Sequence, residues 1–179
     1  MSFFDLLKTR KPDPAPVAPL SDSQVNTELT KYASLIQLTL NEEWGINSNP
    51  QEIEGGGFLF ENFLGSAGFF IGLRRNKMIA ENTIFFTAPI VHLPQSNQIE
   101  FFKRCLEINE TLIGCALSLD NGVVRVVGER VLTGLDKNEF KSMLQSVANS
   151  ANDLDDKLAR EFGAPLIGLG LKTNHDKMR

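Results

Sequence analysis

The chain holds few side chains that could act as a catalytic base. Its only histidines are His92 and His175. A nucleophilic Ser, Cys or Thr needs an oriented base beside it, and a general base needs a second group within hydrogen-bond reach. His92 follows an apolar run, where a lone imidazole usually bonds to the backbone, and His175 lies in a polar stretch. We therefore predict that the protein is not an enzyme and has no catalytic residues.

Two other patterns contain ligand-binding residue types but lack the spacing that the chemistry needs. Asp153, Asp155 and Asp156 form an acidic cluster, yet helical spacing spreads them around a polar face and fits neither a calcium loop nor a carboxylate pair. Residues 55–57 are a glycine triplet, which cradles phosphate only between a strand and a helix. Here the pattern of a strand follows the triplet. The sequence therefore predicts neither a metal site nor a cofactor.

The two cysteines, Cys105 and Cys115, belong to no Cys-x-x-Cys motif and to no Cys/His cluster. A chain of 179 residues has a core large enough to fold without disulfides. A redox sensor would need an exposed thiol with a lowered pKa. We therefore expect both thiols to be reduced and buried.

The charge balance argues against nucleic acid as a partner. The chain has 18 Lys and Arg residues against 22 Asp and Glu residues, a formal net charge of -4. No basic run is long enough to follow a phosphate backbone. The chain also lacks a run of about eighteen apolar residues and the pattern of a signal peptide. These features predict a cytoplasmic protein without stable membrane insertion.

Composition divides the chain into three parts. Residues 1–20 combine an apolar hook with a linker that has four prolines between residues 11 and 19. The hook consists of Phe3, Phe4, Leu6 and Leu7. A linker of this kind is extended and solvated, so we expect residues 1–20 to be disordered. Residues 21–165 are predicted to form one domain, and residues 166–179 a flexible tail. Residues 1–8 have four possible fates: docking on a partner, on a membrane, on the domain itself, or on nothing.

Hydrophobic periodicity predicts three helices and about five antiparallel strands. The helices are expected at residues 21–40, 97–109 and 136–162, and the strands at 58–60, 68–73, 78–91 and on both sides of Asn121 and Gly122. Ser21 with Gln24 and Asp136 with Glu139 have the spacing of capping boxes. An Asn-Gly pair between alternating runs is typical of a tight hairpin turn. The expected order is α-βββ-α-ββ-α, an α+β fold with helices packed on the sheet.

The helix predicted at residues 97–109 has two apolar stripes instead of one. The first consists of Ile99, Phe102 and Leu106, and the second of Phe101, Cys105 and Ile108. A single sheet can cover only one side of this helix, so the second stripe needs a neighbouring element or a second subunit. We therefore expect a homodimer. The candidate residues for a dimer or protein-binding interface are Phe101, Cys105, Ile108 and, from the sheet, Phe85.

Residues 84–165 resemble the bacterial YbjN-type family, a family of sensory transduction regulators that is similar in fold to type III secretion chaperones. The resemblance is carried by residues 84–94, 106–109, 116–122 and 151–155. It implies a dimeric, type III secretion chaperone-like α+β module that lays protein segments along its sheet and helices. It brings no catalytic residues with it.

The expected function is therefore a non-enzymatic protein-binding module, either a chaperone or a regulatory adaptor. Its partner would be a client protein or the protein's own N-terminal segment. Two alternatives are a small-ligand-binding domain with a pocket between sheet and helices, and a membrane-associated adaptor that uses the hook.

Overall fold

The computed structural model describes residues 22–54, 56–64 and 67–167. Three helices lie in this part of the chain: α2 (Asp22–Trp44), α3 (Gln98–Asn109) and α4 (Lys137–Phe162). The strands are β1 (Gln51–Ile53), β2 (Gly57–Leu64), β3 (Ala67–Asn76), β4 (Glu81–His92), β5 (Ala116–Asp120) and β6 (Val123–Val131). None of the helices in the described ranges is long and apolar enough to cross a membrane.

The strands form one antiparallel sheet in the order β1-β2-β3-β4-β6-β5. The predicted α+β fold, with helices packed on an antiparallel sheet, is confirmed. The sheet has one strand more than expected, because β1 was missed. β1 has only three residues, and Gln51 and Glu52 are both exposed, so it shows no apolar alternation to detect.

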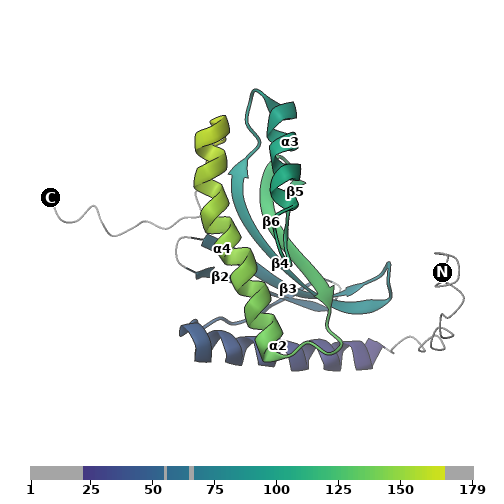
Figure 1. The fold of residues 1–179 in the computed structure, drawn as a ribbon. Helices are drawn as coiled ribbons and strands as arrows, with labels where there is room; N and C mark the ends of the chain where they lie inside the picture. Colours follow the sequence, from purple (N-terminus) through teal and green to yellow (C-terminus); the bar gives the residue numbers. More distant parts are fainter. Residues whose placement is uncertain (1–21, 55, 65–66, 168–179) are drawn as a thin grey trace, which may run out of the picture.

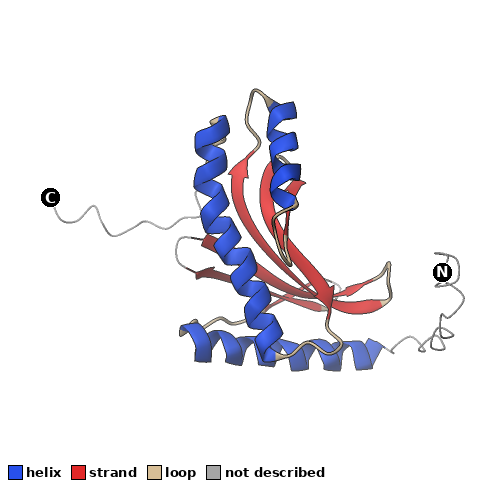
Figure 2. Ribbon diagram, in the orientation of Figure 1, coloured by secondary structure: helices blue, strands red, loops and turns tan. Residues whose placement is uncertain are grey.

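The helices pack on one face of this sheet (Figures 1 and 2). Ile84 and Phe86 of β4 are fully or almost fully buried, and the ring of Phe86 lies 5.7 Å from that of Phe140 in α4. Ile71 of β3 pairs with Phe86 and shares this side. In Figure 1, α2 runs along the bottom of the molecule and α4 rises across the sheet from it. Alternation along β4 therefore leaves Phe85, Thr87 and Pro89 on the opposite face, up to the register shift between Pro89 and Val91.

Local sequence signals set several element ends as predicted. The Asp136 side chain accepts a hydrogen bond of 2.8 Å from the Glu139 backbone N–H, and Gly163 ends α4 with a φ of 64°. Asn121 and Gly122 both have positive φ, at 49° and 78°, as a tight hairpin turn requires.

Other boundaries differ from the prediction. Met78 was expected in a strand, but residues 77–80 form the turn between β3 and β4, and Met78 is exposed. A turn is favoured there because Asn76 accepts a hydrogen bond from the Met78 backbone N–H through its side chain. Helix α2 continues to Trp44, beyond the predicted end near Leu40.

The structure describes the predicted boundary near residue 165 but not the predicted boundary near residue 20. Leu166 forms a bridge with Val91, and the Ile167 N–H donates to the Ile90 carbonyl at 3.2 Å. Backbone pairing thus continues to residue 167, within the segment that was predicted as a tail from residue 166, and the division of the chain into three parts stays a prediction. The predicted hook and linker at residues 1–20, the Ser21 cap and the rest of the tail lie outside the described residues.

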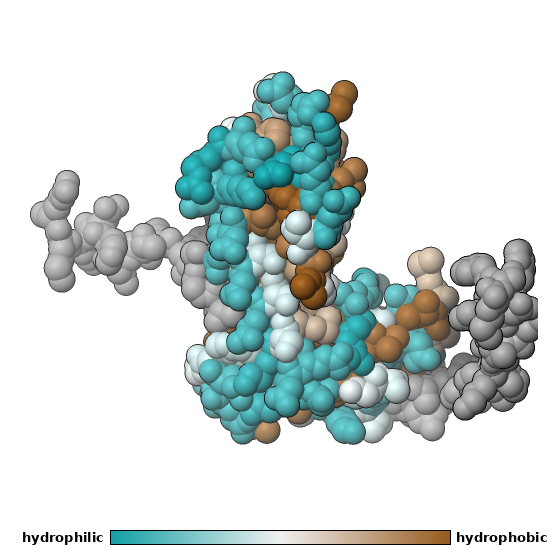
Figure 3. Space-filling view, viewed as in Figure 1, coloured by the Kyte–Doolittle hydropathy of each residue, from teal (hydrophilic) through white to brown (hydrophobic). Residues whose placement is uncertain are grey.

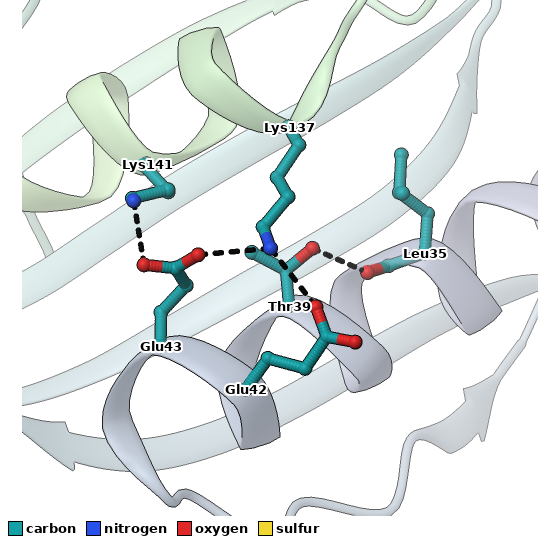
Figure 4. A network of polar contacts seen from close by, with 6 residues as sticks. All are labelled: Leu35, Thr39, Glu42, Glu43, Lys137 and Lys141. Atoms are coloured by element: carbon teal, nitrogen blue, oxygen red, sulfur yellow. Dashed lines mark hydrogen bonds and ion pairs between the residues drawn. The ribbon is translucent and has the colours of Figure 1, made fainter.

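A charged network joins the end of α2 to the start of α4 (Figure 4). Lys137 Nζ lies 2.9 Å from Glu42 Oε2 and 2.8 Å from Glu43 Oε1, and Lys141 Nζ lies 2.5 Å from Glu43 Oε2. Hydrogen bonds from Lys137 and Lys141 hold the pKa of Glu43 below its ordinary value. The same contacts, first with Glu43 and then with Glu42, raise the pKa of Lys137.

This network makes stability depend on pH in a defined direction. A carboxyl group with a lowered folded pKa stabilises the fold above its unfolded pKa and loses that contribution as the pH falls through the folded pKa. Glu43→Gln should therefore lower the urea midpoint at neutral pH, and the difference from wild type should disappear at an acid pH below the folded pKa of Glu43. The effect will be modest because the groups are solvated. Urea titrations at both pH values measure it, with Glu81→Gln as a matched exposed control. A difference that persists at low pH would contradict this assignment.

Candidate functional site

The two apolar stripes of α3 have the opposite roles to those predicted. Phe101 and Ile108 are buried inside the chain, and the Phe101 ring meets that of Phe162 in α4 edge-on at 5.2 Å. The stripe that faces outward contains Ile99 and Leu106, which are 83% and 68% exposed. The expectation that Phe101 and Ile108 form an exposed interface is therefore wrong. The cause is the position of α3, whose Phe101 side turns toward α4 and β5.

A narrow groove runs between α3 and β5. It has a volume of about 190 Å³. Its lining consists of Phe101, Phe102, Cys105, Leu106, Asn109, Leu117, Ser118, Leu119 and Val124. Burial raises the pKa of the Cys105 thiol to about 11, so the thiol is protonated and unreactive at neutral pH. We name this feature the α3 groove.

The surface around the α3 groove is apolar over several elements. Ile113, in the loop after α3, is 86% exposed, and Leu119 of β5 is also exposed. Figure 3 shows hydrophobic surface along the side of the molecule that carries α3. Leu106 and Leu119 both line the α3 groove, whereas Ile99 lies in the first turn of α3 and Ile113 beyond its last.

The second candidate surface is the face of the sheet away from the helices. Phe85 and Thr87 of β4 and Arg125 and Val127 of β6 point to this side, since their strand neighbours point to the helices. We name this side the open face. It contains a hollow of about 720 Å³. The lining consists of Arg74, Phe85, Phe86, Thr87, Gly114, Cys115, Ala116, Ser118, Arg125, Val127, Gly128 and Glu129.

Phe85 forms a fixed platform in the open-face hollow. It pairs with Gly72 of β3, and a Cβ at Gly72 would lie only 1.9 Å from the Phe85 ring atom Cζ. The ring therefore occupies the space that a side chain at position 72 would need. The Arg74 guanidinium stacks on the same ring, with Cζ 4.8 Å from the centroid. The hollow thus has a preorganised apolar floor beside a cation.

The polar groups of the hollow are only partly paired. Arg74 bonds to Glu129 at 3.2 Å, and Arg125 NH1 lies 3.2 Å from Asp120 Oδ2. Arg125 Nε and Thr87 Oγ1 are buried and have no hydrogen-bond partner among the described residues. Neither atom has accessible surface in the hollow. The hollow therefore presents apolar surface from Phe85 and Val127 beside the half-exposed side chain of Arg74.

The structure separates the predicted interface residues. Phe85 lies on the open face, whereas Cys105 and Phe101 line the α3 groove on the helix side. Sequence analysis did not single out Arg74, Thr87 and Arg125. Their alternation with apolar residues along the strands indicates that the three share the face away from the helices. The missing hydrogen-bond partner of Arg125 Nε, in contrast, is visible only in the structure.

The other residues that could act in catalysis or bind a metal ion do not lie close together. His92 is exposed at the end of β4. The Cys115 sulfur lies 3.5 Å from Ser150 Oγ, against α4, and both cysteines are free thiols. Burial raises the pKa of Asp155. Within the described ranges, no three His, Cys, Asp or Glu side chains are placed to hold a metal ion.

No protein-family model and no curated protein matches the chain by sequence. Solved structures do match it. A chain of the ExsC-ExsE complex superposes with a TM-score of 0.50 and 16% identity, over 76% of this chain and 94% of its own length. A chain of the HopA1-SchA chaperone-effector complex gives 0.52 and 12%, over 77% and 99%. A chain from the structure of the Yersinia pestis type III secretion chaperone SycH with a stable fragment of YscM2 gives 0.45 and 16%, over 69% and 98%.

The first two superpositions show a shared fold over most of the described chain. The predicted chaperone-like α+β architecture is thereby confirmed. The resemblance to the YbjN-type family has no support from sequence comparison and stays a prediction.

Proposed function

We propose that this protein is a non-enzymatic, chaperone-like module that binds a segment of another protein on its open face. The observation that carries the proposal is the open-face hollow, where the Phe85 ring covers Gly72 and the Arg74 guanidinium stacks on that ring at 4.8 Å. An extended segment can place alternate side chains on such a surface. The shared fold with a chain of a chaperone-effector complex supports this function.

The proposal includes a homodimer that forms through α3. Ile99, Leu106, Ile113 and Leu119 give the exposed apolar surface that a subunit interface needs at its centre. This interface replaces the one predicted around Phe101. In this reading the protein acts in the cytoplasm as a chaperone or regulatory adaptor of the YbjN type, with the helix side for self-association and the open face for the client.

Selection of displayed peptides tests segment binding without a known client. Random peptides of about sixteen residues, long enough to cross several strands, would be selected against the full chain, Phe85→Asp and Leu38→Asp. We expect wild type and Leu38→Asp to enrich peptides with apolar residues around an Asp or Glu, because the hollow offers Arg74 and Arg125 beside an apolar floor.

Phe85→Asp should enrich no peptides, because it removes the aromatic platform and adds a negative charge that repels the Asp or Glu of the peptide. Leu38 is a matched control because it is an exposed apolar residue on α2, away from the open face. Equal enrichment by Phe85→Asp would place segment binding elsewhere, and no enrichment by wild type would contradict the proposed function.

A further inference from the structure

We propose that the end of β4 is a strand-acceptor site, which the chain's own residues 165–167 fill until an extended apolar segment of another protein displaces them. We name residues 165–167 the blocking segment. The acceptor site is separate from the open-face hollow, so the inference goes beyond the proposed function and does not depend on it. It gives the protein a second binding surface and a built-in competitor for that surface.

The end of β4 lacks one of its two neighbours in the sheet. β3 pairs with β4 from Glu81 only as far as Thr87, whereas β4 continues to His92. On its other side, β4 pairs with β6 up to His92. A strand with a partner on one side only leaves backbone N–H and C=O groups free to recruit another strand. Residues 88–92 therefore have a vacant position on the β3 side.

The blocking segment occupies this position through its backbone. Leu166 forms an antiparallel bridge with Val91. The His92 N–H donates to the Pro165 carbonyl at 2.7 Å, and the Ile167 N–H donates to the Ile90 carbonyl at 3.2 Å. The chain itself thus shows what the site accepts, which is an extended segment with a C=O two residues before an N–H. Proline cannot take the place of Ile167, because it has no N–H to donate.

The side chains at the site favour an apolar occupant. Ile90 and Val91 are 3% and 0% exposed, so the site lies beside the core. Ile167 is partly buried, whereas Leu166 is 52% exposed. A visiting segment should therefore carry an apolar residue in the place of Ile167, and the residue in the place of Leu166 is free to vary.

The end of β4 also differs from the other free strand edges in its charge. Residues 88–94 contain no Lys, Arg, Asp or Glu, whereas β1 carries Glu52 and the free stretch of β6 carries Glu129 and Arg130. Charged side chains are a usual protection of open strand edges against pairing. The end of β4 has no such protection of its own, so the blocking segment covers an edge that would otherwise recruit an extended segment.

The blocking segment is held by few contacts. Among the described residues, its backbone is joined to β4 by the two hydrogen bonds and the single bridge. Gly163 ends α4 in the left-handed conformation and Ala164 is buried, so the segment can leave β4 while the helix stays in place. Segments with few buried contacts open locally, without unfolding of the whole domain. Displacement therefore needs no rearrangement of the core.

Hydrogen exchange of single amides, measured by NMR on the full chain, tests whether the blocking segment opens. The protection factors of the His92 and Ile167 amides should be at least about tenfold lower than that of Phe86, because local opening exposes them before the sheet unfolds. Phe86 is the reference because it lies within β4 and has strand partners on both sides. Equal protection of the three amides would overturn the inference, since the segment would then leave only on global unfolding.

A peptide with the sequence of residues 164–170 tests whether the vacated site accepts a strand. It should shift the NMR signals of Ile90, Val91 and His92 in Ile167→Pro, with half-saturation at a concentration at least about tenfold lower than in wild type. The reason is that the tethered segment competes at a high effective concentration in wild type. Ile167→Val keeps both the N–H and the apolar side chain, so this matched control should behave as wild type. The same peptide with proline in the place of its isoleucine should not bind.

Equal binding of the peptide by wild type and Ile167→Pro, or no binding by either, would also overturn the inference. If Ile167→Pro does not fold, the exchange experiment on wild type decides alone, because it needs no substitution. Adding Phe85→Asp to Ile167→Pro should leave peptide binding unchanged, since Phe85 lies on the open face. A loss of binding would place the peptide on the open face, which rejects this inference and leaves the proposed function standing.

Discussion

Phe101→Glu should leave the domain unfolded, whereas Ile99→Glu with Leu106→Glu should leave it folded and convert a dimer to a monomer. Phe101 is fully buried, so the substitution removes an aromatic ring and places a carboxylate without a partner in the core. Each effect costs roughly 3–5 kcal/mol, against a total stability of about 5–15 kcal/mol. Ile99 and Leu106 are mostly exposed, so charges there change the stability of the subunit by only about 0.5 kcal/mol.

Circular dichroism measures the first part, and light scattering after gel filtration measures the second. Wild type should have the mass of two 19.9 kDa chains, and the double variant that of one. Lys103→Gln with Glu107→Gln, at exposed polar positions of the same helix, is the matched control and should stay dimeric. A monomeric wild type would defeat the dimer proposal, and a folded Phe101→Glu would contradict the packing of α3.

Gly72→Ala should destabilise the protein by about 1–3 kcal/mol, the cost of an overpacked site. Alanine in a strand is normally better than glycine by about 0.5–1 kcal/mol. Here the overlap with the Phe85 ring outweighs that gain, because the new Cβ would lie 1.9 Å from Cζ. Phe85→Ala makes room, so the double variant should be more stable than the sum of the two single effects predicts.

Urea unfolding of the four proteins gives the coupling free energy between positions 72 and 85. Gly72→Ala should also reduce peptide enrichment, because the displaced ring no longer forms a floor beside Arg74. Gly122→Ala is an instructive comparison: it has open space for a Cβ, so any loss there comes from its positive φ and is independent of Phe85. Additive single effects would show that the ring is free to move.

The sequence predicted those features that neighbouring residues decide. Asp136 with Glu139 marked the start of α4, and Asn121 with Gly122 marked the hairpin, because capping and turn geometry act over two to four residues. The antiparallel α+β fold followed from these signals and from the alternation of the strands.

The sequence could not predict which face of α3 is buried. Both stripes are apolar, and the choice between Phe101 and Ile99 depends on where α4 ends and β5 begins, through contacts such as that with Phe162. The candidate site on the open face could not be predicted from the sequence for a similar reason. Arg125 looks like any solvated cation in the sequence, and only the packing of the sheet reveals its unpaired Nε.

Residues 128–131 of β6 extend past the start of β5 and form a free strand edge, through which copies of the chain could pair. An unpaired strand can recruit another strand edge to edge, which is how many β proteins aggregate. Two features oppose this at residues 128–131: Glu129 and Arg130 are charged gatekeepers, and Arg130 Nε donates to the Val131 carbonyl at 2.7 Å, so that one edge acceptor is already occupied. A sheet with a free edge must resist pairing with other copies of the chain, and these two side chains oppose that pairing.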